Sequence, residues 1–175
     1  MTQNITTAQQ AQRRAEQMRA KAYQDMLILN EGNKPRVYKD TKGNRSIGIG
    51  FNLEDKANQR FLKSINVDIN ELFNGRALTE NETRVLYNHS LTQAYKDAMK
   101  FDKGFSKRPE SVKMALVDMS FNLGLTKLNE FKKMKEALKN DDYKTAAAEA
   151  KDSDWFKQVK SRGPRTVDLI KRAAQ

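Results

Sequence analysis

The first regular pattern of apolar residues in the chain ends at a glutamate followed by a glycine. Apolar residues recur there at intervals of three and four, which predicts a helix with one apolar stripe. The stripe consists of Met18, Ala22, Met26 and Leu29. A glycine directly after a helix commonly adopts the left-handed conformation that ends it, so Gly32 places Glu31 in the last turn.

A β-hairpin is predicted after Pro35. Two strand-like runs, residues 36–41 and 45–51, flank the tripeptide Lys42-Gly43-Asn44, which places Gly43 in the turn. The turn residues and the short length of the connection therefore predict two antiparallel neighbouring strands.

The two faces of the second strand of this hairpin differ in the size and polarity of their residues. Alternation directs Ile47 and Ile49 toward a small core, and it directs Ser46, Gly48 and Gly50 to the other face. Glycine within a strand either permits close approach of a ligand, such as an extended sugar chain, or marks a bulge or tight bend. The glycines alone do not decide between these two interpretations.

The remaining pattern is mostly helical. Thr79-Glu80-Asn81-Glu82 has the form of a capping box and predicts a helix that runs to about Lys100. Pro109 opens the next helix, and Gly124 ends it. Shorter helical segments are predicted at residues 128–138, 143–150, 155–159 and 165–173. The chain is therefore predicted to be α+β and mostly helical.

Glu31, Asp40 and Ser46 are the candidate catalytic residues. The negative end of the helix dipole favours the protonated form of Glu31, which is the form that a general acid needs. Each residue also has an ordinary explanation when taken singly. A lone glutamate at a helix end is more simply explained as an exposed surface residue, and aspartate is common beside turns for local reasons.

The order of these three residues, followed by Ile47-Gly48-Ile49-Gly50, resembles the signature of the phage-type lysozymes, the muramidases of glycoside hydrolase family 24. In that family a glutamate ends the first helix, and an aspartate and a threonine lie on the following hairpin. The resemblance extends from about Tyr23 to the end of the chain. It includes residues 115–124, Phe131, Trp155, Gln158, Arg162 and Arg165.

The resemblance implies a lysozyme-like fold in which a small hairpin lobe is joined by a long helix to a helical C-terminal lobe. The corresponding divisions are a basic N-terminal extension, a first helix with the catalytic hairpin, an interlobe helix and a C-terminal lobe. Their expected ranges are residues 1–22, 23–79, 80–100 and 101–175. The alternative for residues 80–100 is an ordinary surface helix.

Further site residues follow from the resemblance. Arg162 is expected to hold the carboxyl group of Glu31, although a solvated surface charge is the default for any arginine. Such a cation opposes the helix dipole, because it favours the ionised form of Glu31. Asn122 is placed at the back of a substrate cleft, or it satisfies a local backbone group. The full set of expected substrate-binding residues is Gly50, Phe51, Leu53, Phe121 and Asn122.

The chain departs from the family pattern at two positions of the hairpin. Ser46 replaces the usual threonine, which keeps the hydroxyl group but loses the methyl group that restricts its rotamer. Phe51 stands where the family often has histidine, so a polar contact made by that histidine is missing. We expect activity to survive the first change.

Composition agrees with a globular enzyme and raises the question of a partner. The chain has 175 residues, of which 38% are hydrophobic, and it has no cysteine, so a disulfide framework and a cysteine site are excluded. A net charge of +11 favours encounter with polyanions, which include both bacterial wall polymers and nucleic acids. The motifs of specific nucleic-acid binders are missing, so we expect no specific nucleic-acid partner. His89 has no apparent ligand partners, so no metal and no cofactor are expected.

Residues 1–22 are polar, basic and helix-prone. They are predicted to extend the first helix into solvent or to fray. A sharper hypothesis is that this segment contacts an anionic outer membrane or a virion partner through Arg13, Arg14, Arg19 and Lys21. Because neither a signal peptide nor a membrane span is recognisable, the family resemblance implies storage in the host cytoplasm until release to the wall, or transport by the virion.

The sequence therefore predicts a monomeric peptidoglycan hydrolase that cleaves the β-1,4 bond between N-acetylmuramic acid and N-acetylglucosamine. Glu31 is the expected general acid, and Asp40 with Ser46 is expected to orient or activate water, with inversion of the anomeric centre. Two alternatives remain open. One is a catalytically silent wall-binding or virion structural domain, and the other is a lytic transglycosylase.

Overall fold

The computed structural model describes residues 7–175, so the first six residues of the predicted extension lie outside the described residues. The chain divides into two compact units, Met1–Thr83 and Arg84–Gln175. We describe each unit by itself. The mostly helical α+β fold class is confirmed.

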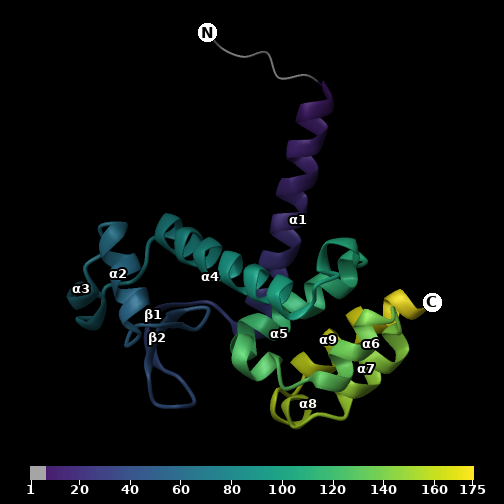
Figure 1. Cartoon of the computed structure of the whole chain (residues 1–175). Helices are drawn as coiled ribbons and strands as arrows, with labels where there is room; N and C mark the ends of the chain where they lie inside the picture. Colours follow the sequence, from purple (N-terminus) through teal and green to yellow (C-terminus); the bar gives the residue numbers. More distant parts are fainter. Residues whose placement is uncertain (1–6) are drawn as a thin grey trace. The chain divides into compact units, whose positions relative to one another are not determined.

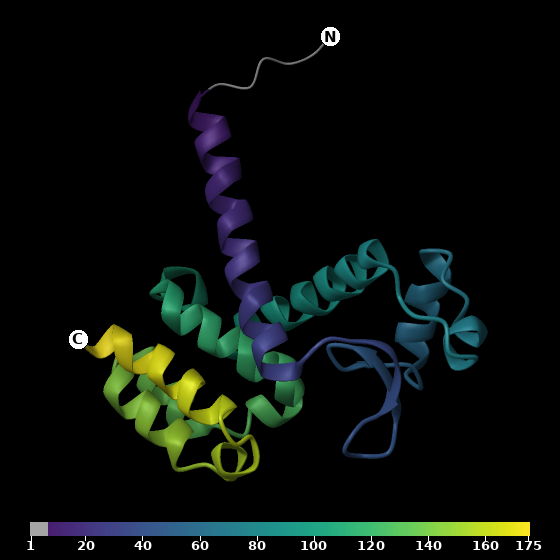
Figure 2. The ribbon, with the colours of Figure 1, turned by 180° about the vertical axis from the view of Figure 1, so that it is seen from behind.

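The N-terminal unit begins with one unbroken helix, α1 (Thr7–Glu31) (Figures 1 and 2). It ends where the sequence predicts. Gly32 has φ of +72°, and its N–H donates a hydrogen bond of 2.8 Å to the carbonyl oxygen of Ile28. The predicted extension of the first helix is confirmed for residues 7–22, where the described side chains are exposed.

The buried face of α1 differs from the predicted stripe. Met18 and Leu29 are 67% and 65% exposed, whereas Tyr23 and Leu27 are 3% and 0% exposed. Tyr23 and Leu27 are four residues apart and so lie on one face of the helix. The periodicity correctly predicted the helix, but different residues form its buried face. Which face of a helix is buried depends on the residues that pack against it, and the spacing of apolar residues within the helix does not identify them.

A three-stranded antiparallel sheet follows α1, in the order β1 (Lys34–Lys39), β2 (Arg45–Gly48) and β3 (Phe51–Asn52). Tyr38 of β1 lies directly opposite Ser46 of β2. Ser46 in turn lies opposite Asn52 of β3. The predicted hairpin is confirmed, and Ser46 occupies the central strand of the sheet.

The predicted second strand is shorter than expected because it turns at its glycines. Gly48 and Gly50 have φ of +65° and +91°, a conformation that favours glycine, and they reverse the chain into β3. The interpretation of a tight bend is therefore correct. Ile47 and Ile49 are buried as predicted, and Ser46 on the other face is also only 1% exposed.

Two helices between the sheet and residue 79 were not predicted from the sequence. They are α2 (Lys56–Ser64) and α3 (Ile69–Phe73). Each begins with an aspartate whose carboxylate accepts hydrogen bonds from backbone N–H groups of the first turn, namely Asp55 and Asp68. These two N-cap aspartates were the signal that could have revealed both helices.

The capping box that opens α4 (Glu80–Phe101) is present. The backbone N–H of Thr79 donates to the carboxylate of Glu82 at 2.9 Å, and the N–H of Glu82 donates to the Thr79 hydroxyl group at 3.1 Å. Two N–H groups that a helix start leaves without helical partners are thereby satisfied.

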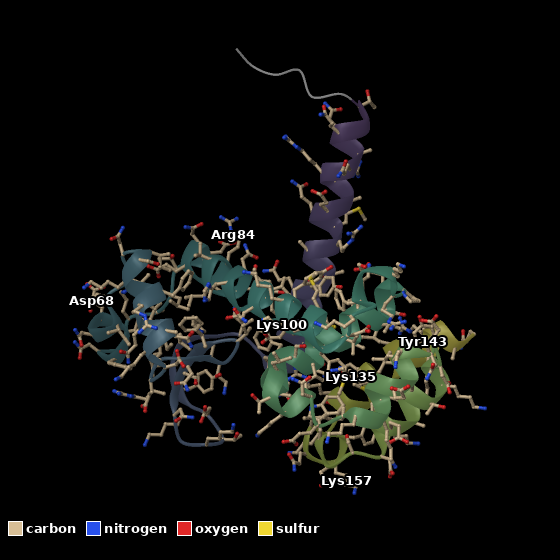
Figure 3. The ribbon with its side chains drawn as sticks, viewed as in Figure 1. Asp68, Arg84, Lys100, Lys135, Tyr143 and Lys157 are labelled. Atoms are coloured by element: carbon tan, nitrogen blue, oxygen red, sulfur yellow. The ribbon has the colours of Figure 1, made fainter. Side chains whose placement is uncertain are left out.

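The C-terminal unit is built around α5 (Glu110–Leu128), which packs against α9 (Arg162–Lys171). The helix α7 (Tyr143–Lys151) packs against both α6 (Lys132–Lys139) and α9 (Figure 1). The shorter elements are η1 (Phe105–Lys107), α8 (Asp154–Gln158) and η2 (Arg172–Ala174). Charged side chains cover the outside, as Lys157 on α8 illustrates (Figure 3).

Glycine again controls the direction of the chain in this unit. Gly124 has φ of +72° and interrupts α5 at the predicted position, after which helical turns resume as far as Leu128. In contrast, the last predicted helix, residues 165–173, begins earlier than expected and includes Gly163 and Pro164. They lie in the first turn of α9, where proline is tolerated because its missing N–H has no helical partner there.

A buried ionic group joins α5 to α9. Asp118 and Arg162 are 0% and 4% exposed. The guanidinium donates to the two oxygens of the Asp118 carboxylate at 3.0 and 2.7 Å, and the Thr166 hydroxyl donates to the same carboxylate at 2.8 Å. Both charges are therefore paired and hydrogen-bonded inside the unit.

We expect the substitution Asp118→Ala to destabilise the C-terminal unit by about 3–5 kcal/mol, because it leaves the buried guanidinium of Arg162 without its counter-charge. Urea unfolding measures the change. Asp168→Ala is the matched control, since it removes an exposed ion pair with Arg172 in the same region and should cost about 0.5 kcal/mol or less. Equal losses in the two variants would contradict a special role for the buried pair.

Candidate active site

The described site residues divide between the two units. Glu31, Asp40, Ser46, Gly50, Phe51 and Leu53 belong to the N-terminal unit, and Phe121, Asn122 and Arg162 belong to the C-terminal unit. The first group comes from consecutive elements: α1, β1 with its turn, β2 with the turn that follows it, and β3 with the residue after it. This group is therefore held by local backbone geometry within one unit.

Glu31 is the last residue of α1 and is half-buried. The left-handed conformation of Gly32 turns the chain immediately after it toward β1. The glutamate is therefore held at a fixed point, the end of a long helix, and its carboxyl group is not remote from solvent. This is the position that the sequence predicts.

Asp40 is held by the turn of the hairpin. One carboxylate oxygen accepts hydrogen bonds from the backbone N–H groups of Lys42 and Asn44, both at 2.8 Å. The other accepts from the side-chain amide of Asn44 at 3.2 Å. The backbone N–H of Asp40 also donates to the carbonyl oxygen of Asn44 at 2.8 Å, so the aspartate closes the hairpin and is fixed by it.

These hydrogen bonds determine the charge of Asp40. Partial burial raises the pKa of its carboxyl group, but hydrogen bonds from Asn44 and Lys42 and the positive charge of Lys42 outweigh this effect. The pKa is therefore held below its ordinary value. Asp40 is consequently an anion at neutral pH.

Tyr38 is a residue of this site that the sequence analysis did not assign. Burial raises the pKa of its phenol, and the negative charges of Glu31 and Asp40 raise it further, whereas a hydrogen bond from the backbone of Gly50 lowers it. Both carboxylates therefore lie within electrostatic range of one phenol group. The only sequence signal was its place in the motif, two residues before Asp40.

The predicted substrate-binding residues of the N-terminal unit lie on or beside the turn between β2 and β3. Gly50 is exposed, but Phe51 and Leu53 are 5% and 0% exposed. The ring of Phe51 lies 6.3 Å from that of Phe61, measured between ring centroids. The side chains of Phe51 and Leu53 therefore support the turn, and a ligand at this place would meet main-chain atoms.

Asn122 in the C-terminal unit is exposed and accepts a hydrogen bond of 2.9 Å from the indole N–H of Trp155. This contact differs from the local backbone bond that was the alternative in the sequence analysis. Phe121 is half-buried beside it.

Trp155 and Phe131, whose rings meet edge to face, help to line a hollow of about 680 Å³ that has both acidic and basic residues at its rim.

Arg162 makes its described hydrogen bonds to Asp118. Its predicted contact with Glu31 stays a prediction. The sequence analysis missed Asp118, because an acidic residue within an apolar helical run gives no indication of which basic residue will face it.

Among residues 7–175, no group of three or more His, Asp or Glu side chains is arranged to hold a metal ion. Over the same residues, no helix combines the length and the apolar character that a bilayer span requires.

The chemistry of the N-terminal unit is that of a pair of carboxyl groups with a hydroxyl group and a phenol nearby. One carboxyl group is at a helix end, and the other is a permanent anion on a hairpin turn. Protonation of a leaving oxygen together with stabilisation of a positive sugar ring is the task that glycoside hydrolases give to two such carboxyl groups. The site therefore has the composition of a glycoside hydrolase site.

Comparison with known proteins supports the same class. The model of the phage lysozyme family matches residues 29–175. Two probable T4-type lysozymes of Dictyostelium discoideum, numbers 2 and 1, are 28% identical over 155 and 163 residues, which cover 83% of this chain and 91% of each relative. The pre-baseplate central spike protein Gp5 of Enterobacteria phage T4 is 30% identical over 156 residues, or 83% of this chain and 27% of that protein.

The chain belongs to the phage lysozyme family. It is a glycoside hydrolase that acts on peptidoglycan. The family match begins at residue 29, so most of α1 precedes the matched region.

The lowered pKa of Asp40 has a consequence for the pH dependence of the hairpin. A group whose pKa is lower in the folded state contributes stability that is present above its unfolded pKa, here near 3.8. That contribution is lost as the pH falls through the lowered folded value. We expect the hydrogen-exchange protection of the Lys42 and Asn44 amides to decline only in this acidic range.

The variant Asn44→Ala should raise the pKa of Asp40 part of the way to its ordinary value, because the two backbone N–H groups still donate. Carboxyl ¹³C NMR measures the titration of Asp40 directly. Asn33→Ala, a change at an exposed asparagine before β1, serves as the control and should leave the titration unchanged. An unshifted Asp40 in the Asn44 variant would show that the side-chain bond contributes little.

Proposed function

We propose that the chain cleaves the β-1,4 bond between N-acetylmuramic acid and N-acetylglucosamine, with Glu31 as the general acid. The proton of Glu31 passes to the glycosidic oxygen as the bond from that oxygen to the anomeric carbon breaks. A water molecule forms the new bond to that carbon. The support for this role is the place of Glu31 at the end of α1, where its charge acts on the same phenol group, Tyr38, as that of the anionic Asp40.

Asp40 acts in this proposal on the opposite face of the sugar ring. Its low pKa makes it a weak base toward free water, since base strength falls with pKa. Its full negative charge is better suited to hold the water and to stabilise the positive charge that develops on the ring. The proton of the water is released to Asp40 as the new bond forms, when that proton has become acidic.

Ser46 is proposed to fix the same water molecule. It is buried at the centre of the small sheet, opposite Tyr38, so its hydroxyl group has a defined position. A hydroxyl group both donates and accepts, and it can therefore complement a water that also contacts a carboxylate. Arg162 is proposed to position the carboxyl group of Glu31, as the family resemblance implies.

A water that attacks from the face opposite the leaving group inverts the anomeric configuration. Inversion is therefore part of the proposal. A lytic transglycosylase would instead form an anhydro sugar without consuming water. A silent wall-binding domain would form no product. No specific observation favours either alternative.

Glu31→Gln is the decisive variant for the general acid. We expect turnover of a purified wall suspension to fall at least about a hundredfold, because general acid catalysis typically contributes that much or more. The fold should be kept, since the amide has the same shape as the protonated acid, and thermal unfolding checks this. A variant that still clears the suspension at a near-normal rate would refute the assignment.

The products of the wild-type enzyme test the remainder of the mechanism. Mass spectrometry of muropeptides separates hydrolysis from transglycosylation by the mass of one water. NMR of the first product formed from a defined oligosaccharide identifies the anomer. A retained configuration would require Asp40 to act as a nucleophile. An anhydro sugar among the products would show that the enzyme is a transglycosylase and not a hydrolase.

The N-terminal part of α1 is proposed to bring the enzyme to an anionic envelope. Residues 7–22 carry four basic residues and one acidic residue, the described side chains are exposed, and the segment lies outside the family match. The basic residues are Arg13, Arg14, Arg19 and Lys21. Either release from the host cytoplasm or transport by a virion is compatible with this role, and the enzyme is proposed to act as a monomer without a specific nucleic-acid partner.

Deletion of residues 1–20 tests this role, because it keeps the buried residues Tyr23 and Leu27. We expect unchanged activity on purified wall and lower activity on intact cells. Replacement of the four basic residues by glutamine in the full chain should reproduce the effect if charge is its cause. Equal losses on the two substrates, or no loss on either, would remove the proposal.

A further inference from the structure

Tyr38 stands at the junction of the three elements that form the site of the N-terminal unit. It lies on β1, directly opposite Ser46 on the central strand, and two residues before Asp40. The negative charges of Glu31 and Asp40 both reach its phenol group.

The side chain of Tyr38 is fixed from two sides. A hydrogen bond from the backbone of Gly50, in the turn between β2 and β3, lowers the pKa of the phenol, which is the effect of a donor to its oxygen. The ammonium group of Lys34 lies 4.2 Å from the centroid of the ring, which is the geometry of a cation–π contact. The ring is half-buried, so the phenol still has an accessible side.

The protonation state of the phenol follows from its surroundings. Burial and two neighbouring negative charges raise its pKa above the ordinary value of 10.0, and the hydrogen bond from Gly50 offsets only part of this. Tyr38 therefore keeps its proton at the pH of any cell. Since its oxygen already accepts from Gly50, the O–H group is left as a neutral donor.

A neutral donor complements what the two carboxylates cannot provide. An ionised carboxylate only accepts hydrogen bonds, and the one proton of Glu31 is committed to the glycosidic oxygen. The hydroxyl, carbonyl and ring oxygens of an N-acetylated sugar also need donors when they lose water on binding. Tyr38 has such a donor on the strand that leads from Glu31 to Asp40.

We propose that Tyr38 is a substrate-positioning residue whose phenol O–H donates a hydrogen bond to an oxygen of the sugar bound beside Glu31 and Asp40. This inference rests on the proposed function, because it assumes that the sugar ring lies next to both carboxyl groups. The turn at Gly48–Gly50 has a second purpose in this arrangement. It brings the backbone of Gly50 within hydrogen-bonding range of the phenol.

The variant Tyr38→Phe removes only the hydroxyl group and keeps the ring. We expect kcat/KM on a soluble peptidoglycan oligosaccharide to fall about three- to tenfold, the value of one neutral hydrogen bond. The same loss should appear in affinity. The Glu31→Gln background slows turnover and so allows binding to be measured. There, adding Tyr38→Phe should weaken the binding of a peptide-free tetrasaccharide of alternating N-acetylglucosamine and N-acetylmuramic acid by a similar factor.

Tyr95→Phe is the matched control, because it removes a phenol hydroxyl from α4 in the C-terminal unit. It should change neither affinity nor kcat/KM. Thermal unfolding of both variants separates a structural effect from a binding effect. If Tyr38→Phe lowers the melting temperature while the affinity of the Glu31→Gln background is unchanged, the hydroxyl group is structural and the proposal is wrong.

The proximity of Glu31 to the phenol of Tyr38 can be tested without substrate. In protein labelled with ¹³C at the phenol carbon of tyrosine, Glu31→Gln should lower the pKa of Tyr38, because it removes a nearby negative charge. The resonance is assigned by its loss in Tyr38→Phe. An unchanged titration would overturn the arrangement on which the proposal depends.

Failure of the proposed function would be distinguishable from failure of this inference. A wild-type enzyme that leaves the wall intact, or a Glu31→Gln variant that remains active, would refute the catalytic assignment. The affinity comparison would still decide the role of Tyr38, since it requires binding but no turnover. Equal affinities with and without the hydroxyl group would refute that role, whatever the catalytic result.

Discussion

Hydrogen bonds from a single turn to the Asp40 carboxylate are the interaction on which the site depends. The N–H groups of Lys42 and Asn44 and the amide of Asn44 fix both oxygens. The same contacts close the hairpin, place β1 beside β2, and keep the carboxylate charged. Because the strands are paired through this turn, the position of Tyr38 opposite Ser46 follows from the same local geometry.

Positive backbone dihedral angles at glycine set the directions of the neighbouring elements. Gly32 ends α1 at Glu31, and Gly48 and Gly50 reverse the chain after β2. A side chain built at Gly50 would meet no other atom within 4 Å, so its φ of +91°, and not crowding, is the reason for glycine. The spacing of these glycines along the sequence thus carries much of the information about the site.

The sequence predicted the features that depend on local chemistry. The helix stop at Gly32, the hairpin turn, the capping box at Thr79 and the break at Gly124 each follow from one or two residues whose conformational preferences are strong. The predicted apolar stripe on α1 was wrong because burial depends on contacts with residues far away in the sequence. The spacing of apolar residues along one helix carries no information about those contacts. The helices α2 and α3 were missed because they are short, with nine and five residues, and because their N-cap aspartates were not used.

The same distinction applies to the candidate site. Glu31, Asp40 and Ser46 could be selected from their order in the motif, and the structure places them in the expected elements. Tyr38 could not be assigned, because its relation to Ser46 depends on strand register and its relation to Glu31 depends on the path of the chain after Gly32. Asp118 was hidden for a similar reason, since its partner Arg162 is 44 residues away in sequence.

Because the buried arginines are paired with aspartates, the net positive charge of the molecule lies on its surface. Among the described residues, the buried charged side chains are Arg108 and Arg162 together with Asp102 and Asp118, which pair with them. These pairs cancel, so the excess of +11 is carried by side chains that face water. At physiological ionic strength such charges are screened over roughly 8 Å, so the attraction to an anionic wall is short-ranged and should weaken in brine.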